Sequence, residues 1–341
     1  MFKKDSWHRF FVMLLMISVL IVVVFYISIT NGTYDMSVSE VIRTLLGLDT
    51  SREFKLVVFE FRLPRIITAL LVGLGLSIAG LVVQGITKNP LADPGIMGIN
   101  SGAGLAIIIF MYFFQGSIKT TSIIGSLSMP FFGLVGGLAS ALLIYVFAWK
   151  GGRLDSQRLI LCGIAIGSGL GALSLFLSLK MSASDFEMAS VWINGSIWNA
   201  NWRSVYSIVP WFVVLLPIII KKAYVLDLFQ LEESSVKSLG ISTEKEKAIL
   251  LLACIGLISS CVSVSGNIGF VGLIAPHIAK RLVGIHHHKA VFVCGAVGML
   301  MVLLSDYIGR TFFQPVELPV GIIVSLIGVP YFVYLLFKGK V

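Results

Sequence analysis

Residues 10–29 read FFVMLLMISVLIVVVFYISI and contain no charged side chain. A membrane-spanning α-helix needs about 20 mainly apolar residues to cross a hydrocarbon core about 30 Å thick. The basic segment 1–9 looks like the start of a signal peptide, but the apolar run is longer than in such peptides and no small-residue cleavage motif follows it. We therefore predict that residues 10–29 form the first membrane span.

The rest of the chain has the same apolar character. Of its 341 residues, 57% are hydrophobic and 13% are charged, compared with roughly 25% charged in a soluble domain. Apolar runs separated by charged residues or by Gly and Pro predict an all-α integral membrane protein, with a single transmembrane domain over residues 1–341. The ten predicted spans are 10–29, 64–86, 96–114, 126–148, 157–179, 205–220, 247–265, 268–283, 290–308 and 319–337.

Glycines cluster within several of these spans, at spacings that place small residues on one face of a helix. Small residues let two helix backbones approach closely, so we expect tight helix packing at these positions. The clustered glycines are Gly73, Gly75 and Gly80; Gly133, Gly136 and Gly137; and Gly163, Gly167 and Gly171.

The distribution of basic residues predicts how the chain lies in the membrane. With the N-terminus inside, 17 of the 26 Lys and Arg residues lie on the inner side, which then carries the whole net charge of +9. Cytoplasmic loops hold an excess of Lys and Arg, so we predict that both termini are cytoplasmic. Long connections then lie outside at 31–62 and 180–203 and inside at 221–247. The basic residues are scattered between apolar segments, which indicates contact with membrane lipid and no nucleic-acid partner.

The sequence lacks the usual signatures of an enzyme or an ATPase. It contains no phosphate-binding G-x-x-x-x-G-K-[ST] loop, no H-E-x-x-H zinc motif and no G-x-S-x-G nucleophile motif. Ionisable groups are rare in the predicted spans; Asp93, Asp306 and His277 lie near span ends, where we expect them to reach water. We therefore predict neither catalysis nor a bound cofactor, and we expect a partner protein to supply the energy for transport.

Three consecutive histidines, His286, His287 and His288, raise the question of a metal site. Consecutive side chains on a loop point in divergent directions and seldom converge on one ion. We therefore predict a solvated cytoplasmic turn and no metal site in this segment.

Four segments together resemble one protein family. The first is RLPR at 62–65, and the second runs from QGITKNPLADP at 84–94 into GINSGAG at 98–104. The other two are GFVGLIAPHIAKR at 269–281 and ELPVG at 317–321. As a set they resemble the iron-siderophore and cobalamin permease family of ABC importers, which has the type II fold. The resemblance extends over residues 10–338.

This resemblance implies a permease subunit in the cytoplasmic membrane of a bacterium. Two permease chains, either two copies or this chain and a paralogue, would enclose a central pathway. Two cytoplasmic ATPase subunits and an extracytoplasmic substrate-binding protein would complete the complex. The implied mechanism is alternating access driven by ATP hydrolysis, with a ferric siderophore as cargo. Haem or cobalamin is the alternative cargo, and a secondary transporter or channel working alone is the alternative class.

The motif at 62–65 supplies two candidate docking residues. Arg62 and Arg65 are three positions apart at the outer end of a predicted helix, so they face one direction, and Pro64 suits the first helical turn. Two guanidinium groups on one face suit paired carboxylates. The resemblance implies that Arg62, Arg65 and Arg310 contact acidic residues of the binding protein. Contact with lipid phosphate is the alternative.

The segment 89–94 supplies a candidate gate. It holds two prolines, so an unbroken helix cannot pass through it. The resemblance implies that Asn89 and Leu91 belong to the cytoplasmic gate of the pathway. A simple structural turn is the alternative.

The inner connection 221–247 contains an amphipathic segment, LEESSVKSLG at 231–240, that ends in a helix-stopping glycine. It resembles the coupling helix that rests in a groove of the ATPase. The residues implied to make this contact are Glu233, Val236, Leu239 and Gly240. The segment departs from the family pattern, because Glu232 stands where Gly is usual and Val236 where Ala is usual. The shape of the ATPase groove therefore does not follow from the family pattern.

Overall fold

The computed structural model describes residues 6–32, 36–48, 51–114, 123–151 and 153–338. The described chain is helical apart from one short ribbon, in which β1 pairs antiparallel with β2. Its elements are α1 (Trp7–Thr30), α2 (Val38–Leu45), α3 (Arg52–Lys55), the π-helix η1 (Leu56–Arg62), α4 (Leu63–Thr87), the 3-10 helix η2 (Pro94–Met97), α5 (Ile99–Phe114), α6 (Ile123–Ala148), β1 (Trp149–Lys150), β2 (Arg153–Leu154), α7 (Ser156–Ser178), α8 (Ala183–Ile193), α9 (Trp202–Leu228), α10 (Glu233–Ser238), α11 (Thr243–Ser265), α12 (Val271–Val283), α13 (His287–Thr311) and α14 (Val320–Lys338).

Each of the ten predicted spans coincides with one of these helices. Within the described residues, seven helices are long and apolar enough to cross a membrane: α1, α4 together with the preceding residues from Arg52, α6, α7, α9, α11 and α13. The predicted spans 96–114, 268–283 and 319–337 fall on the shorter helices α5, α12 and α14. With 13 residues, α12 is about 20 Å long, less than the thickness of the hydrocarbon core.

The centre of the bundle is α4, which packs against α13, α11, α12 and α9. Glycines in α4 allow the backbones of the neighbouring helices to approach it closely. A Cβ atom on Gly73 would overlap the carbonyl oxygen of Gly298 in α13, and one on Gly80 would overlap that of Gly272 in α12. Tight packing is thus confirmed at these two positions. At Gly171 in α7 it is not, because no other side chain or segment of the described chain lies within 4 Å of the space a Cβ atom would fill.

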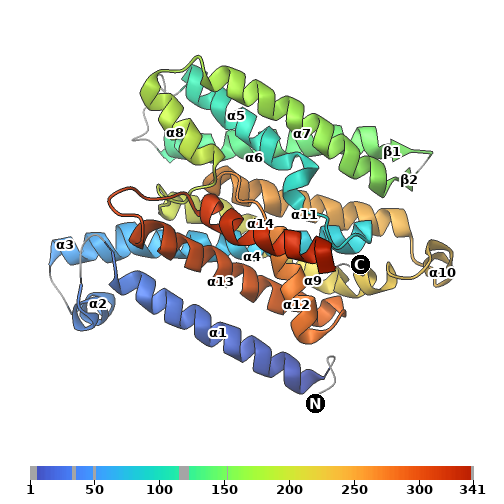
Figure 1. Ribbon diagram of the computed structural model, residues 1–341, viewed down its shortest axis with the longest axis horizontal. Helices are drawn as coiled ribbons and strands as arrows, with labels where there is room; N and C mark the ends of the chain where they lie inside the picture. Colours follow the sequence, from blue (N-terminus) through green and yellow to red (C-terminus); the bar gives the residue numbers. More distant parts are fainter. Residues whose placement is uncertain (1–5, 33–35, 49–50, 115–122, 152, 339–341) are drawn as a thin grey trace.

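The long helices run side by side and define two ends of the molecule (Figure 1). The start of α1, the end of α14, α10 and the β1–β2 ribbon lie at one end, which we call the α10 end. Helices α2, α3 and α8 lie at the other, the α2 end. The sequence predicted one side of the membrane for the connections 31–62 and 180–203. It predicted the opposite side for the connection 221–247 and for both termini. The distribution of these elements between the two ends agrees with that grouping.

Candidate functional site

The structure brings together the three arginines predicted to dock a partner, Arg62, Arg65 and Arg310, at the α2 end. The Nη1 of Arg62 donates to the carbonyl oxygens of Ile29 at 2.6 Å and Thr30 at 3.1 Å, at the end of α1. The Nη2 of Arg310 donates to the hydroxyl oxygen of Ser28 at 2.6 Å. Two arginines from different helices therefore hold the same end of α1.

Arg65 is bound by carboxylates of its own chain. Its Nη2 lies 2.9 Å from Oδ1 of Asp306 in α13 and 2.9 Å from Oε2 of Glu317, just before α14. Asp306 is 1% exposed, so the prediction that it reaches water is wrong. Its charge is tolerated in the interior because Arg65 pairs with it directly and Arg310 Nε lies 3.9 Å from its other oxygen.

The arginine group therefore joins three helices, α1, α4 and α13. Arg62 turns to α1 and Arg65 to α13, although their spacing predicted that both would face one direction. All three guanidinium groups have partners within the chain. A docking protein that binds them has to add to these contacts or compete with them.

The predicted gate segment follows the end of α4. Lys88 has a left-handed φ of 52°, which ends the helix. The side-chain oxygen of Asn89 accepts a hydrogen bond from the backbone N–H of Leu91 at 2.9 Å, and its carbonyl oxygen accepts one from Ala92 at 3.1 Å. This compact turn leads into η2. A small hollow of about 40 Å³ lies beside it, lined by Val83, Thr87, Asn89, Leu91, Ala92, Asp93 and Ile160.

Two further contacts tie interrupted helices to one another. The amide nitrogen of Gln84 in α4 donates to the carbonyl oxygens of Gly272 at 3.4 Å and Leu273 at 3.3 Å, in the first turn of α12. The amide nitrogen of Asn100 in α5 donates to the side-chain oxygen of Asn267 at 2.6 Å. The first contact joins the second and third sequence motifs, and the second joins the second motif to a residue just before the third.

The predicted coupling segment forms the short helix α10. Glu233 pairs with Lys237 at 2.7 Å and lies 3.7 Å from Lys247 of α11. Val236 is 1% exposed and anchors the helix, whereas Leu239 is 63% exposed. Gly240 has a φ of 80°, the left-handed conformation in which glycine commonly stops a helix. The segment thus presents Leu239 to the surroundings while its opposite face is packed.

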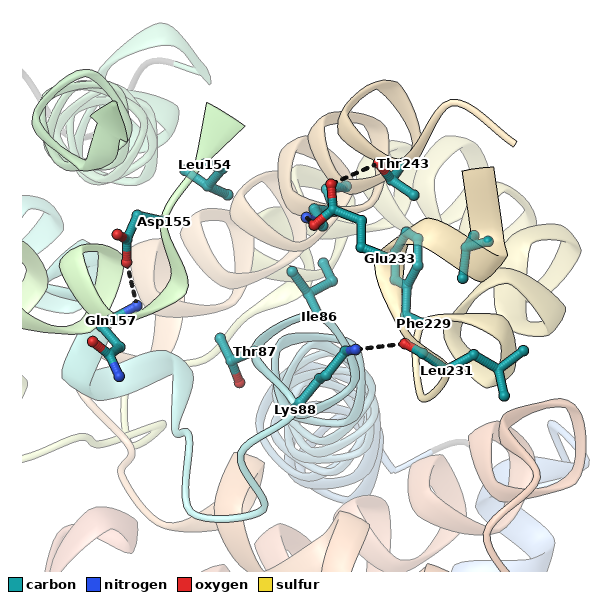
Figure 2. A pocket seen from close by; sticks show the side chains of 12 residues that line it. Ile86, Thr87, Lys88, Leu154, Asp155, Gln157, Phe229, Leu231, Glu233 and Thr243 are labelled. Carbon is teal, nitrogen blue, oxygen red and sulfur yellow. Dashed lines mark hydrogen bonds and ion pairs between the residues drawn. The ribbon is translucent and has the colours of Figure 1, made fainter. Parts of the chain in front are cut away.

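A pocket of about 340 Å³ opens at the α10 end beside this segment (Figure 2). It is lined by Ile86, Thr87, Lys88, Leu154, Asp155, Gln157, Phe229, Leu231, Glu233, Val236, Thr243 and Lys247. Lys88 crosses it and donates through Nζ to the carbonyl oxygen of Leu231 at 2.7 Å. This bond links the end of α4, next to the gate segment, to the residues that lead into α10. Thr87 lines both the pocket and the small hollow at the gate segment.

Neither Lys88 nor Asp155 was predicted from the sequence to belong to a site. Asp155 caps α7, because its Oδ1 accepts from the backbone N–H groups of Gln157 at 2.9 Å and Arg158 at 3.1 Å. An aspartate directly before an apolar run is a recognisable helix-start signal. Lys88 carried no such signal, because its partner is a backbone carbonyl 143 positions away.

Comparison with known proteins assigns the class. Residues 20–338 match the model of the FecCD transport family. The chain is 54% identical over 321 residues to the iron-uptake system permease protein FeuC of Bacillus subtilis, covering 94% of this chain and 96% of that one. It is 45% identical over 337 residues to the iron(3+)-hydroxamate import system permease protein FhuG of Bacillus subtilis, covering 99% and 100%.

A solved structure agrees with these relatives. A metal-chelate type ABC transporter in an inward-facing conformation superposes with a TM-score of 0.82 at 29% identity, covering 96% of this chain and 99% of that one. The fold is therefore that of a type II ABC importer permease, and the protein is a multi-pass membrane permease and not an enzyme. The chain belongs to the FecCD transport family. A permease of this class works with an ATPase and a substrate-binding protein.

Proposed function

We propose that this permease carries a ferric siderophore across the cytoplasmic membrane of a bacterium by alternating access. The observation that carries the proposal is the 54% identity to an iron-uptake permease over 94% of the chain. The iron(3+)-hydroxamate permease, at 45% identity, supports the same class of cargo. The other cargoes considered, haem and cobalamin, have no comparable support among these relatives.

We infer that the α10 end is cytoplasmic and the α2 end is extracytoplasmic. The excess of basic residues at the first supports this orientation, as does the presence there of the start of α1, the end of α14 and the coupling segment. Two ATPase subunits then bind at the α10 end of a permease dimer. The dimer consists of two copies of this chain or of this chain and a paralogue, and the binding protein approaches the α2 end.

The candidate site residues take their proposed roles from this orientation. Arg62, Arg65 and Arg310 bind acidic groups of the docking protein. Asn89 and Leu91 form part of the cytoplasmic gate. Glu233, Val236, Leu239 and Gly240 transmit movements of the ATPase, and the bond between Lys88 and Leu231 gives those movements a direct route to the gate segment.

Uptake by intact cells tests the cargo. Cells from which this chain has been removed are given radioiron as catecholate, hydroxamate and citrate complexes, with labelled haem and cobalamin in parallel. We expect uptake of at least one iron complex to fall to background and to return when the chain is restored. Unchanged uptake of all three iron complexes, or loss of haem or cobalamin uptake alone, would contradict the proposal.

A further inference from the structure

The end of α9 meets the start of α13 at a cluster of one carboxylate and two exposed imidazoles. Nδ1 of His286 lies 3.9 Å and Nδ1 of His288 lies 3.8 Å from Oδ2 of Asp227. One ligand atom from each of these three residues lies within 4.8 Å of the other two. Asp227 is distant in sequence from the histidines, so only the fold places the three groups together.

The three consecutive histidines diverge, as expected from the sequence, but two of them still lie close to one carboxylate. The middle one, His287, is 1% exposed and turns into the protein. His286 and His288, two positions apart, remain on the same side, and their ring centroids are 5.7 Å apart. Because His287 turns inward, the imidazoles of His286 and His288 are left facing the same carboxylate oxygen of Asp227.

The buried histidine holds that carboxylate in place. Oδ1 of Asp227 accepts a hydrogen bond from the backbone N–H of His287 at 2.8 Å and lies 2.7 Å from its ring Nδ1. These contacts occupy one carboxylate oxygen and leave the other directed at His286 and His288. Hydrogen bonds of this kind commonly orient the residues that bind a metal.

Charges of both signs surround the cluster. The C-terminal end of α9, 27 residues long, is the negative end of its helix dipole and offsets the positive start of α13. The neighbouring Lys289 is 5% exposed, and its Nζ lies 4.8 Å from the ring centroid of Trp7, whose ring also packs against His288 with the centroids 6.0 Å apart. Lys280 of α12 is close enough to Asp227 to interact with its charge. The side chains of His286, His288 and Asp227 are 48%, 45% and 26% exposed, so an ion and its remaining water ligands can reach them.

We propose that Asp227, His286 and His288 form a binding site for a divalent first-row transition metal ion. Imidazole nitrogen and carboxylate oxygen are the ligands that zinc and ferrous iron share, at metal–ligand distances of about 2.0 to 2.2 Å. The three ligand atoms, which lie within 4.8 Å of one another, have to move closer together to reach those distances. This inference does not depend on which cargo the permease carries.

A bound ion would join α9 to α13 at the α10 end. Asp227 is the last residue but one of α9, and α10 begins at Glu233. The ion therefore restrains the helix end that leads directly into the proposed coupling segment. It links the metal content of the surrounding solution to the position of that segment.

The test is metal binding by the full permease complex, purified with a tag that contains no histidine. Co²⁺ is titrated while its visible absorption bands are followed, and Zn²⁺ is then added in competition. We expect one saturable site per chain. In the double variant His286→Asn/His288→Asn, affinity should fall by at least about tenfold. The control His8→Asn, which changes an exposed histidine outside the cluster, should bind as the unaltered chain does.

Thermal unfolding provides a second readout. Zn²⁺ should raise the unfolding temperature of the unaltered complex and not that of the double variant, because an ion that binds only the folded state stabilises it. The two proteins should unfold at the same temperature without metal, which shows that the variant is folded. Equal affinity in the double variant, or no saturable binding to the unaltered chain, would overturn the proposal.

Discussion

Arg65 and Asp306 form an ion pair across the interface of α4 and α13, with Arg65 Nη2 2.9 Å from Asp306 Oδ1. The carboxylate is 1% exposed, whereas Glu317, the second partner of Arg65, has a side chain that is 28% exposed. One arginine thus carries a buried structural contact and a more accessible one. This difference allows the role of Arg65 in the fold to be separated from its proposed role in docking.

Asp306→Asn should destabilise the permease strongly. It leaves the partly buried Arg65 and the buried Arg310 without their charged partner in α13, and breaking a buried pair in this way costs about 3 to 5 kcal/mol. The measurement is unfolding of the purified complex in detergent. Glu317→Gln is the control, for which we expect a loss below about 1 kcal/mol because the pair is partly exposed. Equal losses in the two variants would argue against a structural role specific to Asp306.

Glu317→Gln should strengthen docking of the binding protein. The substitution removes one internal competitor of Arg65, and a partly exposed pair is worth up to about 1 kcal/mol, or about fivefold in affinity. Arg65→Gln/Asp306→Asn, which removes the guanidinium without leaving its buried carboxylate partner charged, should weaken docking while the ATPase still copurifies. Affinity is measured with the complex in lipid nanodiscs. The docking assignment fails if neither substitution changes the affinity.

Leu239→Asp should reduce both copurification of the ATPase and uptake. Leu239 is 63% exposed, so the change adds charge to the proposed contact surface without disturbing the packed side of α10. Ile285→Asp is a matched control, because Ile285 is 70% exposed in the connection between α12 and α13. The control should retain the ATPase and the unfolding temperature. Normal copurification with Leu239→Asp would exclude this residue from the coupling contact.

Gly80→Leu should prevent normal assembly of the bundle. The new side chain meets the backbone of Gly272 in α12, and overpacking of this kind costs about 1 to 3 kcal/mol or more. Gly171→Ala should be tolerated, because the described chain leaves open space at that position. The two variants are compared by their yield of folded protein in size-exclusion chromatography. Similar yields would show that α4 and α12 can separate without cost.

The sequence predicted the helices well because uninterrupted apolar runs report directly on membrane spans. Residues 10–29 fall within α1, and the break at 89–94 appears as a turn followed by η2. The helix stop at Gly240 was equally predictable from the sequence, because glycine is the residue that commonly takes the left-handed conformation at the end of a helix. In each case the decisive interaction is local.

Features that depend on partners distant in the chain were not predictable. Asp306 was expected to reach water, because nothing next to it in sequence shows that Arg65, 241 positions away, neutralises it in the interior. The histidines at 286–288 were expected to form a solvated turn, and His286 and His288 are indeed exposed. His287 is buried beside Asp227, which lies on another helix and could not be foreseen as its partner. Charge pairs between helices are set by the packing, which single-sequence patterns do not contain.

The most direct test of the central claim is transport by the purified complex in sealed proteoliposomes. The complex, with its ATPase and binding protein, is supplied with radioiron bound to the siderophore that supports uptake in cells. We predict accumulation that requires ATP and the binding protein and that stops when the ATPase is inactivated. Accumulation that continues at the same rate without ATP would contradict the account and indicate a transporter that works alone.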